Sequence, residues 1–305
     1  DRLSNFRLIG TLRRVKSQNP THAQKHPRSG YAEMLRSIRL RIEFIVQRKT
    51  KIAIAITSTQ SGDGKTFIST NLAGLYAMTG RPTVLLDMDI RKPNVHDKLG
   101  LEAKEGVTNY LIGDCDLEDI IIHHESLTFD VIPAGTIPPN PGELIRSDKL
   151  TELINILRER YDYVVIDSSP VGMVPDALAL IEQTDITLFV IRCMETNKHF
   201  AQQTLQALAL NHKDKINLIL SDIVVNKSGG YGSSYGYGSG YGYGYGYGYG
   251  YGYGYGYGYG RKSRGKYGKY GTYGKYGKYA AYYRHKFTKK NVDAPHQYID
   301  DSDED

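Results

Sequence analysis

The sequence predicts an α/β domain with a doubly wound, mostly parallel sheet, followed by a disordered tail rich in tyrosine and glycine. Between residues 31 and 226, apolar runs rich in β-forming residues alternate with segments of helical pattern, an order typical of doubly wound folds. Most of these runs are continuously apolar, as expected for strands that are buried on both faces of a sheet. After residue 226 almost no aliphatic residue remains, so the folded core should end there.

The individual elements follow from these runs. The expected strands are residues 51–57, 82–87, 128–132, 161–167, 186–192 and 216–226. The expected helices are residues 65–79, 147–160, 175–184 and 197–211. The third helix should open with Pro175 and Asp176, because the first turn of a helix tolerates a missing N–H and favours a negative charge.

The segment ahead of the domain, residues 1–28, carries seven Lys and Arg residues against one acidic residue. A flexible basic arm beside the cytoplasmic face of a membrane has this composition, and so does a solvated arm with no membrane nearby. No apolar run reaches the roughly 18 residues of a membrane span. The chain begins with Asp rather than Met, so any span is expected upstream of residue 1.

The tail, residues 227–305, differs from the domain, residues 29–226, in charge as well as in composition. Residues 1–226 contain 27 basic and 27 acidic residues, residues 227–290 contain 12 basic and no acidic ones, and residues 291–305 contain six acidic and no basic ones. Repeats of Tyr, Gly, Lys and Ser bury too little apolar surface to offset the entropy of ordering, so we expect disorder. Two cysteines, Cys115 and Cys193, have neither metal nor disulfide spacing and indicate a reducing compartment.

A phosphate-binding loop is the strongest chemical signal. The stretch 57-TSTQSGDGKTFISTNLA-73 follows the first expected strand and opens the first helix. It matches the P-loop pattern G-x-x-x-x-G-K-[ST], except that Thr59 replaces the first glycine, which makes it a deviant Walker A motif. Backbone N–H groups near the helix start would hold phosphates, Lys65 would reach the β- and γ-phosphates, and Thr66 would ligate Mg²⁺. We therefore expect a nucleotide site, rather than a plain glycine-rich turn, at Thr59, Gln60, Ser61, Gly62, Asp63, Gly64, Lys65, Thr66 and Phe67.

Three aspartates could complete this site. Asp87 and Asp89 follow the second expected strand, and Asp167 ends the fourth. Ligands of parallel sheets bind at the carboxyl ends of the strands, where these three residues should meet. A single aspartate after a strand is usually a loop residue, but three in a chain with a P-loop indicate a site that takes ATP and Mg²⁺ as cofactors.

Together these motifs resemble the bacterial tyrosine kinases, or BY-kinases. The resemblance covers about residues 30–226 and rests on the P-loop, on the run 84-VLLDMDIRKP-93, on the run ending in Asp167 and on 133-PAGTIPPNPGELIRS-147. Upstream, 33-EMLRSIR-39 fits the E-x-x-R-x-x-R helix that builds a ring of subunits in that family. Glu33, Arg36 and Arg39 would lie on one helix face, where a neighbouring subunit could pair with them; by themselves they would indicate only a solvated helix.

The resemblance implies an ATP- and Mg²⁺-dependent protein tyrosine autokinase with a P-loop NTPase-like fold. Lys65 and Thr66 would hold the triphosphate, and Asp87 would accept the tyrosine proton. The metal would be held by Thr66, Asp89 and Asp167. The expected catalytic residues are Lys65, Asp87, Asp89 and Asp167, with positioning and charge neutralisation supplying most of the catalysis.

In this family, one subunit presents the tyrosines of its tail to the active site of the next. The tail of this chain departs from the family in its long Tyr-Gly repeat at residues 241–260, which we expect to provide reach. The expected phosphorylation sites are the lysine-spaced Tyr267, Tyr270, Tyr273, Tyr276, Tyr279, Tyr282 and Tyr283.

The resemblance also implies partners and a location. The expected partners are further copies in a ring, an octamer in the family, together with a membrane-embedded activator, fused upstream or separate, and a phosphotyrosine phosphatase. The location would be the cytoplasmic side of the inner or plasma membrane, and the process would be the synthesis and export of extracellular or capsular polysaccharide.

Two other interpretations stay open. A P-loop ATPase of the partition or positioning type shares the deviant Walker architecture, but such proteins carry a signature lysine early in the loop, where this sequence has Gln60 or Ser61. Alternatively, the tail itself could be an interaction or RNA-binding module, because residues 261–279 alternate bases and tyrosines. The acidic end at residues 300–305 opposes RNA, so nucleic acid is not the expected partner.

Overall fold

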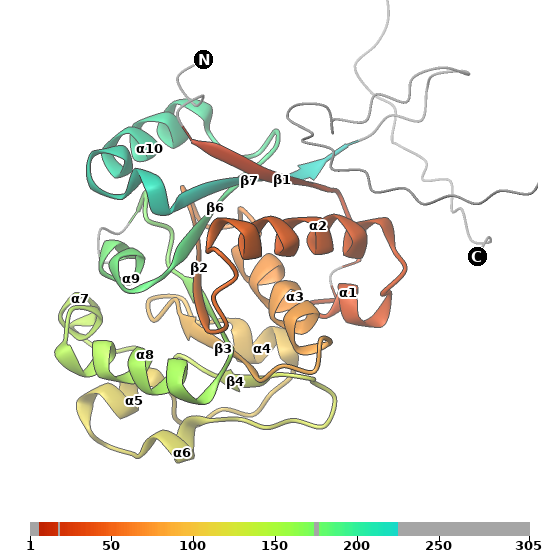
Figure 1. Cartoon of the computed structure of the whole chain (residues 1–305). Helices are drawn as coiled ribbons and strands as arrows, with labels where there is room; N and C mark the ends of the chain where they lie inside the picture. The colour runs from red at the N-terminus through yellow and green to blue at the C-terminus, as the bar shows by residue number, and fades with distance from the viewer. Residues whose placement is uncertain (1–5, 18, 174–176, 225–305) are drawn as a thin grey trace, which may run out of the picture. The chain divides into compact units, whose positions relative to one another are not determined.

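The computed structural model describes residues 6–17, 19–173 and 177–224, and its centre is a seven-stranded parallel sheet (Figure 1). The strands are β1 (Arg7–Arg13), β2 (Ile52–Ser58), β3 (Thr83–Met88), β4 (Asp130–Ile132), β5 (Tyr163–Ser168), β6 (Ile186–Arg192) and β7 (Ile216–Ile223). Their order across the sheet is β1-β7-β6-β2-β5-β3-β4, and every strand pairs in parallel with its neighbours. The predicted doubly wound α/β fold is confirmed.

Helices cover both faces of the sheet. One face packs against α1 (His22–Lys25), α2 (Gly30–Ile45), α3 (Lys65–Ala77) and α4 (Val95–Leu99). The other packs against α5 (Val107–Ile112), α6 (Leu117–Ile120), α7 (Pro141–Ile145), α8 (Asp148–Arg160), α9 (Ala177–Gln183) and α10 (Lys198–His212), with a 3₁₀ turn at Lys213–Lys215 before β7. Strand β2 divides its side chains accordingly: Ile54 lies in the core under α2 and α3, and Ala53 lies in the core under α8. Both faces are therefore buried, as the apolar runs indicate.

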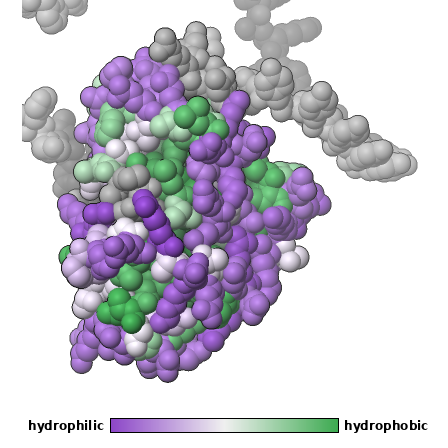
Figure 2. Space-filling model, turned by 90° about the vertical axis from the view of Figure 1, so that its left-hand side faces the viewer, coloured by the Kyte–Doolittle hydropathy of each residue, from purple (hydrophilic) through white to green (hydrophobic). Residues whose placement is uncertain are grey.

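All the expected strands and helices form, with ends that shift by a few residues. Pro175, Asp176 and the tail lie outside the described residues. Helix α8 shows why a helical pattern was recognisable: Leu150, Leu153, Ile154 and Leu157 are its buried side chains, at the spacing of one helix face. On the side that carries α9 and α10, Figure 2 shows hydrophobic residues in separate patches among hydrophilic ones. The outward faces of the helices on this side are thus largely polar.

The expectation of a flexible arm over residues 1–28 is wrong for residues 7–13. They form β1, an edge strand that pairs in parallel with β7. Ile9 and Leu12 of this strand are buried in the core beneath α2. Gly10 lets α2 approach closely, because a Cβ there would lie 2.2 Å from Cγ1 of Ile38. The basic residues that suggested an arm are outward-facing positions of this strand or lie beyond it.

In the part of the chain that the structure describes, no helix is both long and apolar enough to cross a membrane.

Candidate nucleotide site

The P-loop connects the end of β2 to the start of α3, as the sequence motif predicts. Gly62 and Gly64 have φ values of 90° and 92°, in the left-handed region that glycine adopts without strain. Helix α3 begins at Lys65, so the N–H groups of the loop gather at the positive end of a 13-residue helix. Lys65 and Thr66 occupy the first turn and are buried. This backbone and these side chains suit a chain of phosphate groups.

Asp63 holds the loop together from within. Its Oδ1 accepts a hydrogen bond from Thr196 Oγ1 at 2.7 Å, and its Oδ2 accepts one from the Gln60 N–H at 3.2 Å. Burial raises the pKa of Asp63, while these hydrogen bonds and Lys65 oppose the rise. Asp63 was predicted as part of the nucleotide site, and its side chain stabilises the conformation of the loop.

The remaining loop residues differ in exposure. Thr59 is buried, its hydroxyl has no hydrogen-bond partner among the described residues, and Gly172 packs directly against its carbonyl oxygen. Gln60 accepts a hydrogen bond from Ser58 Oγ at its carbonyl oxygen (2.7 Å), and Ser61 is exposed. Unlike Gly62 and Gly64, Thr59 does not have a positive φ, so the first position of this loop does not require glycine.

Two of the aspartates predicted for the site are buried next to each other on neighbouring strands. Asp87 on β3 and Asp167 on β5 are partners in the strand register, and both are buried. Burial, together with the Asp167 carboxylate, raises the pKa of Asp87 to about 7. Burial also raises the pKa of Asp167 to about 6, against the effect of a hydrogen bond from Thr66 and of nearby Lys65.

The oxygens of these carboxylates are used differently. Asp87 Oδ1 accepts the Asp89 N–H at 3.0 Å, and Oδ2 accepts the Val95 N–H at 3.2 Å. Asp167 Oδ1 is buried with no partner among the described residues. An unpartnered buried carboxylate oxygen next to a P-loop threonine is what a hydrated cation would complete.

Asp89 is the third carboxylate at this edge of the sheet. Its Oδ1 accepts a hydrogen bond from Ser169 Oγ at 2.8 Å, which ties the loop after β3 to the loop after β5. Among the described residues, no group of three or more His, Cys, Asp and Glu side chains is arranged to hold a metal ion. Mg²⁺ suits such a sparse site, because it commonly takes one or two protein oxygens and fills its other positions with water and substrate phosphates.

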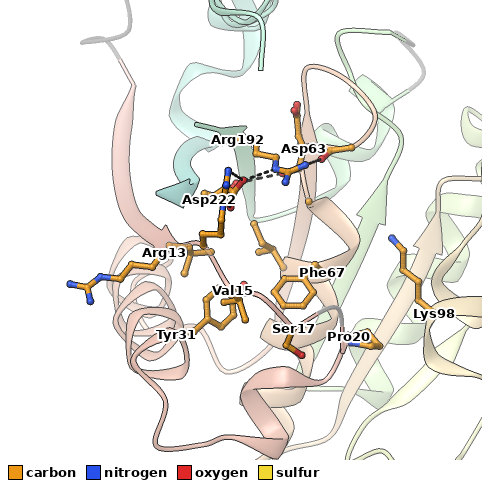
Figure 3. Close-up of a pocket in the computed structure, with 16 residues that line it drawn as sticks. Arg13, Val15, Ser17, Pro20, Tyr31, Asp63, Phe67, Lys98, Arg192 and Asp222 are labelled. Carbon is orange, nitrogen blue, oxygen red and sulfur yellow. Dashed lines mark hydrogen bonds and ion pairs between the residues drawn. The ribbon is translucent and has the colours of Figure 1, made fainter. Parts of the chain in front are cut away.

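A cavity of about 380 Å³ opens beside the P-loop (Figure 3). The loop residues Gly62–Gly64 form one part of its wall, and Val15, Tyr31 and Phe67 form an apolar part. The rings of Tyr31 and Phe67 lie 5.5 Å apart, and the buried Tyr31 hydroxyl has no partner among the described residues. The apolar, aromatic part of this wall suits the base of a nucleotide.

An ion-pair chain at the top of this cavity was missed by the sequence analysis. Arg14 donates two hydrogen bonds to Asp222, at 2.7 and 2.8 Å, and Arg192 Nε donates to the same carboxylate at 3.0 Å. Arg192 also donates from Nη1 to the carbonyl oxygen of Gly62 at 3.3 Å. The chain therefore links β1, β7 and β6 to the P-loop. Their positions in the sequence were the available signal, because Arg192 is the last residue of β6 and Asp222 lies near the carboxyl end of β7, so both lie where the parallel strands end.

The residues predicted to join subunits lie on α2. Glu33 pairs with Arg36 within the helix, and its side chain is 65% exposed. Arg36 also donates to the carbonyl oxygen of Pro27, and Arg39 donates to that of Leu75 at 3.0 Å. Both arginines thus make contacts inside the subunit as well, which their spacing in the sequence did not indicate.

Comparison with known proteins identifies related chains. The model of the AAA domain family matches residues 50–221. Tyrosine-protein kinase YwqD of Bacillus subtilis is 33% identical over 217 residues, which are 71% of this chain and 92% of that protein. A putative tyrosine-protein kinase, CapB of Staphylococcus aureus, is 31% identical over 70% of this chain and 93% of that protein.

Solved structures show the same similarity. The kinase domain of the Escherichia coli tyrosine kinase ETK superimposes with a TM-score of 0.68 at 25% identity, over 77% of this chain and 98% of that one. The chimerical protein CapA2B2 gives a TM-score of 0.64 at 30% identity, over 70% and 94%. The chain is thus an AAA domain protein with a P-loop. Within that class it belongs to the bacterial tyrosine-protein kinases, as its motifs predict, and its enzyme class is that of the protein-tyrosine kinases.

Proposed function

We propose that this protein uses ATP and Mg²⁺ to phosphorylate tyrosines in the tail of a neighbouring copy. One observation carries the proposal. The first turn of α3 holds Lys65 and Thr66 beside Asp167, whose Oδ1 is buried without a partner among the described residues. This arrangement suits a nucleotide with its metal. The tyrosine-rich tail of this tyrosine kinase supplies candidate acceptor hydroxyl groups on a second copy of the chain.

Each group of residues would bind one part of the nucleotide. The N–H groups of the loop and Lys65 would hold the phosphates, and the cavity beside Tyr31 and Phe67 would take the base. Thr66, Asp89 and Asp167 would hold the metal through oxygen atoms and waters. Bound Mg²⁺ would neutralise charge on the phosphates. Ser169 would keep the Asp89 carboxylate in a fixed orientation.

Asp87 is our candidate for the group that accepts the tyrosine proton. A pKa of about 7 suits a general base at neutral pH. Both of its oxygens accept backbone N–H groups, so its carboxylate is oriented as well as buried. Replacement by Asn would keep one acceptor oxygen and remove the basicity, and we expect it to lower the rate of transfer more than the affinity for ATP.

In the sequence the tail follows β7, the last described strand, and its length would allow it to reach a neighbouring copy. In a parallel sheet all strands end at the same edge, so β7 leads out beside the P-loop. A glycine-rich coil of about 40 residues spans roughly 35 Å, which is enough to reach the site of a neighbour. The lysine-spaced Tyr267–Tyr283 would then be the acceptors, with the repeat at residues 241–260 as the spacer.

The wider setting is proposed from the family resemblance. Glu33, Arg36 and Arg39 would build the ring of subunits, and a membrane-embedded activator would place the protein at the cytoplasmic side of the membrane. A phosphotyrosine phosphatase would reverse the modification, and the process controlled would be the synthesis and export of extracellular or capsular polysaccharide. The matched segment is only 30% of the related putative kinase AmsA of Erwinia amylovora, so a longer relative can carry the rest on one chain.

The decisive experiment separates the active site from the acceptor. A full-length Lys65→Met chain is mixed with an active chain that ends at residue 226, and ATP and Mg²⁺ are added. We expect phosphotyrosine on the full-length chain, mapped by mass spectrometry mainly to Tyr267–Tyr283.

Three controls make the result interpretable. The Lys65→Met chain alone should stay unmodified, and undiminished phosphotyrosine there would refute the assignment of the active site. Absence of transfer in the mixture, with activity in the wild-type chain, would refute transfer between copies. Phosphate found mainly within residues 241–260 would refute our choice of acceptors.

A further inference from the structure

Lys98 is a cation near the nucleotide site that belongs to none of the motifs described above. It lies on α4, the short helix that follows the loop carrying Asp87 and Asp89. Its side chain lines the same cavity as Gly62–Gly64 and Phe67, and Figure 3 shows it extending from the side opposite Tyr31. No hydrogen bond or ion pair engages its ammonium group within the described part of the chain.

The position of Lys98 is set by the site itself. The N–H of Val95, in the first turn of α4, donates to Asp87 Oδ2 at 3.2 Å, and Val95 is fully buried. The Lys98 N–H continues the helix with a bond to the Asn94 carbonyl oxygen at 3.1 Å. One carboxylate therefore anchors the turn from which Lys98 projects, so the lysine and the aspartates of the site form one unit.

The charges near Lys98 indicate which end of a bound nucleotide it would face. Desolvation lowers the pKa of Lys98 and Lys65 adds to this, whereas Asp167, Asp87 and Asp89 raise it. These carboxylates lie at the ends of β3 and β5, away from β6 and β7, whose ends line the cavity. In phosphoryl transfer, the carboxylates and the metal gather around the phosphate that moves. Lys98 would therefore face the end of the nucleotide that carries the terminal phosphate.

From this geometry we propose that Lys98 is a second phosphate-binding lysine, which contacts the terminal phosphate of the bound triphosphate. This inference rests on the proposed ATP-dependent function and adds to it a preference for ATP over ADP. The P-loop cradles the phosphates common to ATP and ADP, whereas Lys98 responds to the phosphate that only ATP has. The side chain therefore lets the site distinguish the loaded from the spent nucleotide.

The test compares two nucleotides and four proteins. Full-length wild type, Lys98→Met, Lys98→Arg and Lys92→Met are titrated with a non-hydrolysable ATP analogue and with ADP, both with Mg²⁺, by calorimetry. Lys92 is the matched control, because it is an exposed lysine six residues away that does not line the cavity. A charge-assisted hydrogen bond corresponds to roughly 10- to 100-fold in affinity.

We expect Lys98→Met to lose about tenfold or more in affinity for the triphosphate analogue and less than about twofold for ADP. Lys98→Arg should recover most of the loss, and Lys92→Met should bind both nucleotides as wild type does. Equal losses for the two nucleotides, or no loss in Lys98→Met, would overturn the inference.

The outcome for wild type separates this inference from the proposed function. If wild type binds neither nucleotide, the ATP-dependent function fails and the role of Lys98 fails with it. If wild type binds both and Lys98→Met is unchanged, only the role of Lys98 fails. Thermal unfolding of the nucleotide-free variants, expected to match wild type because the side chain is exposed, shows that a lost affinity does not come from a lost fold.

Discussion

Asp87 and Asp167 face each other in register on the adjacent parallel strands β3 and β5, with both carboxyl groups buried. Neither has a cation within salt-bridge distance among the described residues, so the two negative charges and their burial work against the fold when no metal is bound. Their raised pKa values are the consequence. The two aspartates that suit a Mg²⁺ site therefore lower the stability of the metal-free protein.

Stability of the metal-free protein should fall as pH rises. The folded pKa values of about 7 and about 6 lie above the ordinary 3.8. Between about pH 4 and pH 7 the folded state therefore holds more protons than the unfolded state, and the free energy of unfolding decreases with pH. We expect Asp167→Asn to flatten this dependence and to be more stable than wild type at pH 8 by about 2 kcal/mol. Urea unfolding of both proteins between pH 5 and pH 8, in the presence of EDTA, measures this pH dependence of the free energy of unfolding.

Asp185 supplies a control of opposite sign. Burial raises its pKa, but the Ala53 N–H, Lys49 and Arg158 outweigh this and lower it overall. Its ionised form therefore stabilises the fold above about pH 4. Asp185→Asn should lose stability at pH 8, where Asp167→Asn gains it. A loss of stability in both variants would show that burial does not govern the Asp87–Asp167 pair.

Strand β1 should be part of the folded unit. Ile9 is 1% exposed and lies in the core under α2, whereas its neighbour Leu8 is 47% exposed. We expect Ile9→Ala to lower the free energy of unfolding by about 2–4 kcal/mol, because it leaves a cavity in a packed core. Leu8→Ala, the same kind of truncation one residue away, should change it by less than about 1 kcal/mol. If denaturant unfolding gave equal losses of stability for Ile9→Ala and Leu8→Ala, residues 7–13 would not be part of the folded core.

Substitutions on α2 should separate assembly from folding. The Glu33 side chain is 65% exposed, so Glu33→Ala should weaken assembly without changing the stability of a single subunit. Arg39 also donates a hydrogen bond to the Leu75 carbonyl oxygen. Arg39→Ala should therefore weaken assembly and also lower the free energy of unfolding of a single subunit by about 1 kcal/mol. Analytical ultracentrifugation and thermal unfolding below the assembly concentration measure the two effects. An unchanged size for Glu33→Ala would argue against this helix as the subunit interface.

The fold class, the P-loop and the three aspartates could be predicted from consecutive residues alone. Strands buried on both faces must be continuously apolar, and a loop that binds phosphate needs glycine at particular backbone angles, so both features are written in consecutive residues. The helices were recognisable for the same reason, since the burial of one face imposes a spacing such as that of Leu150, Leu153 and Leu157.

Three features became visible only in the folded chain: residues 7–13 form a strand, Arg14, Asp222 and Arg192 form one chain of ion pairs, and Lys98 lies at the cavity. Strand β1 contains a glycine and has basic ends, and its stability comes from partners about 200 residues away on β7. Lys98 in the sequence is one lysine among many until Asp87 anchors α4 beside the P-loop. Contacts between distant segments leave no local pattern, because their free energy depends on distances that exist only after the chain has folded.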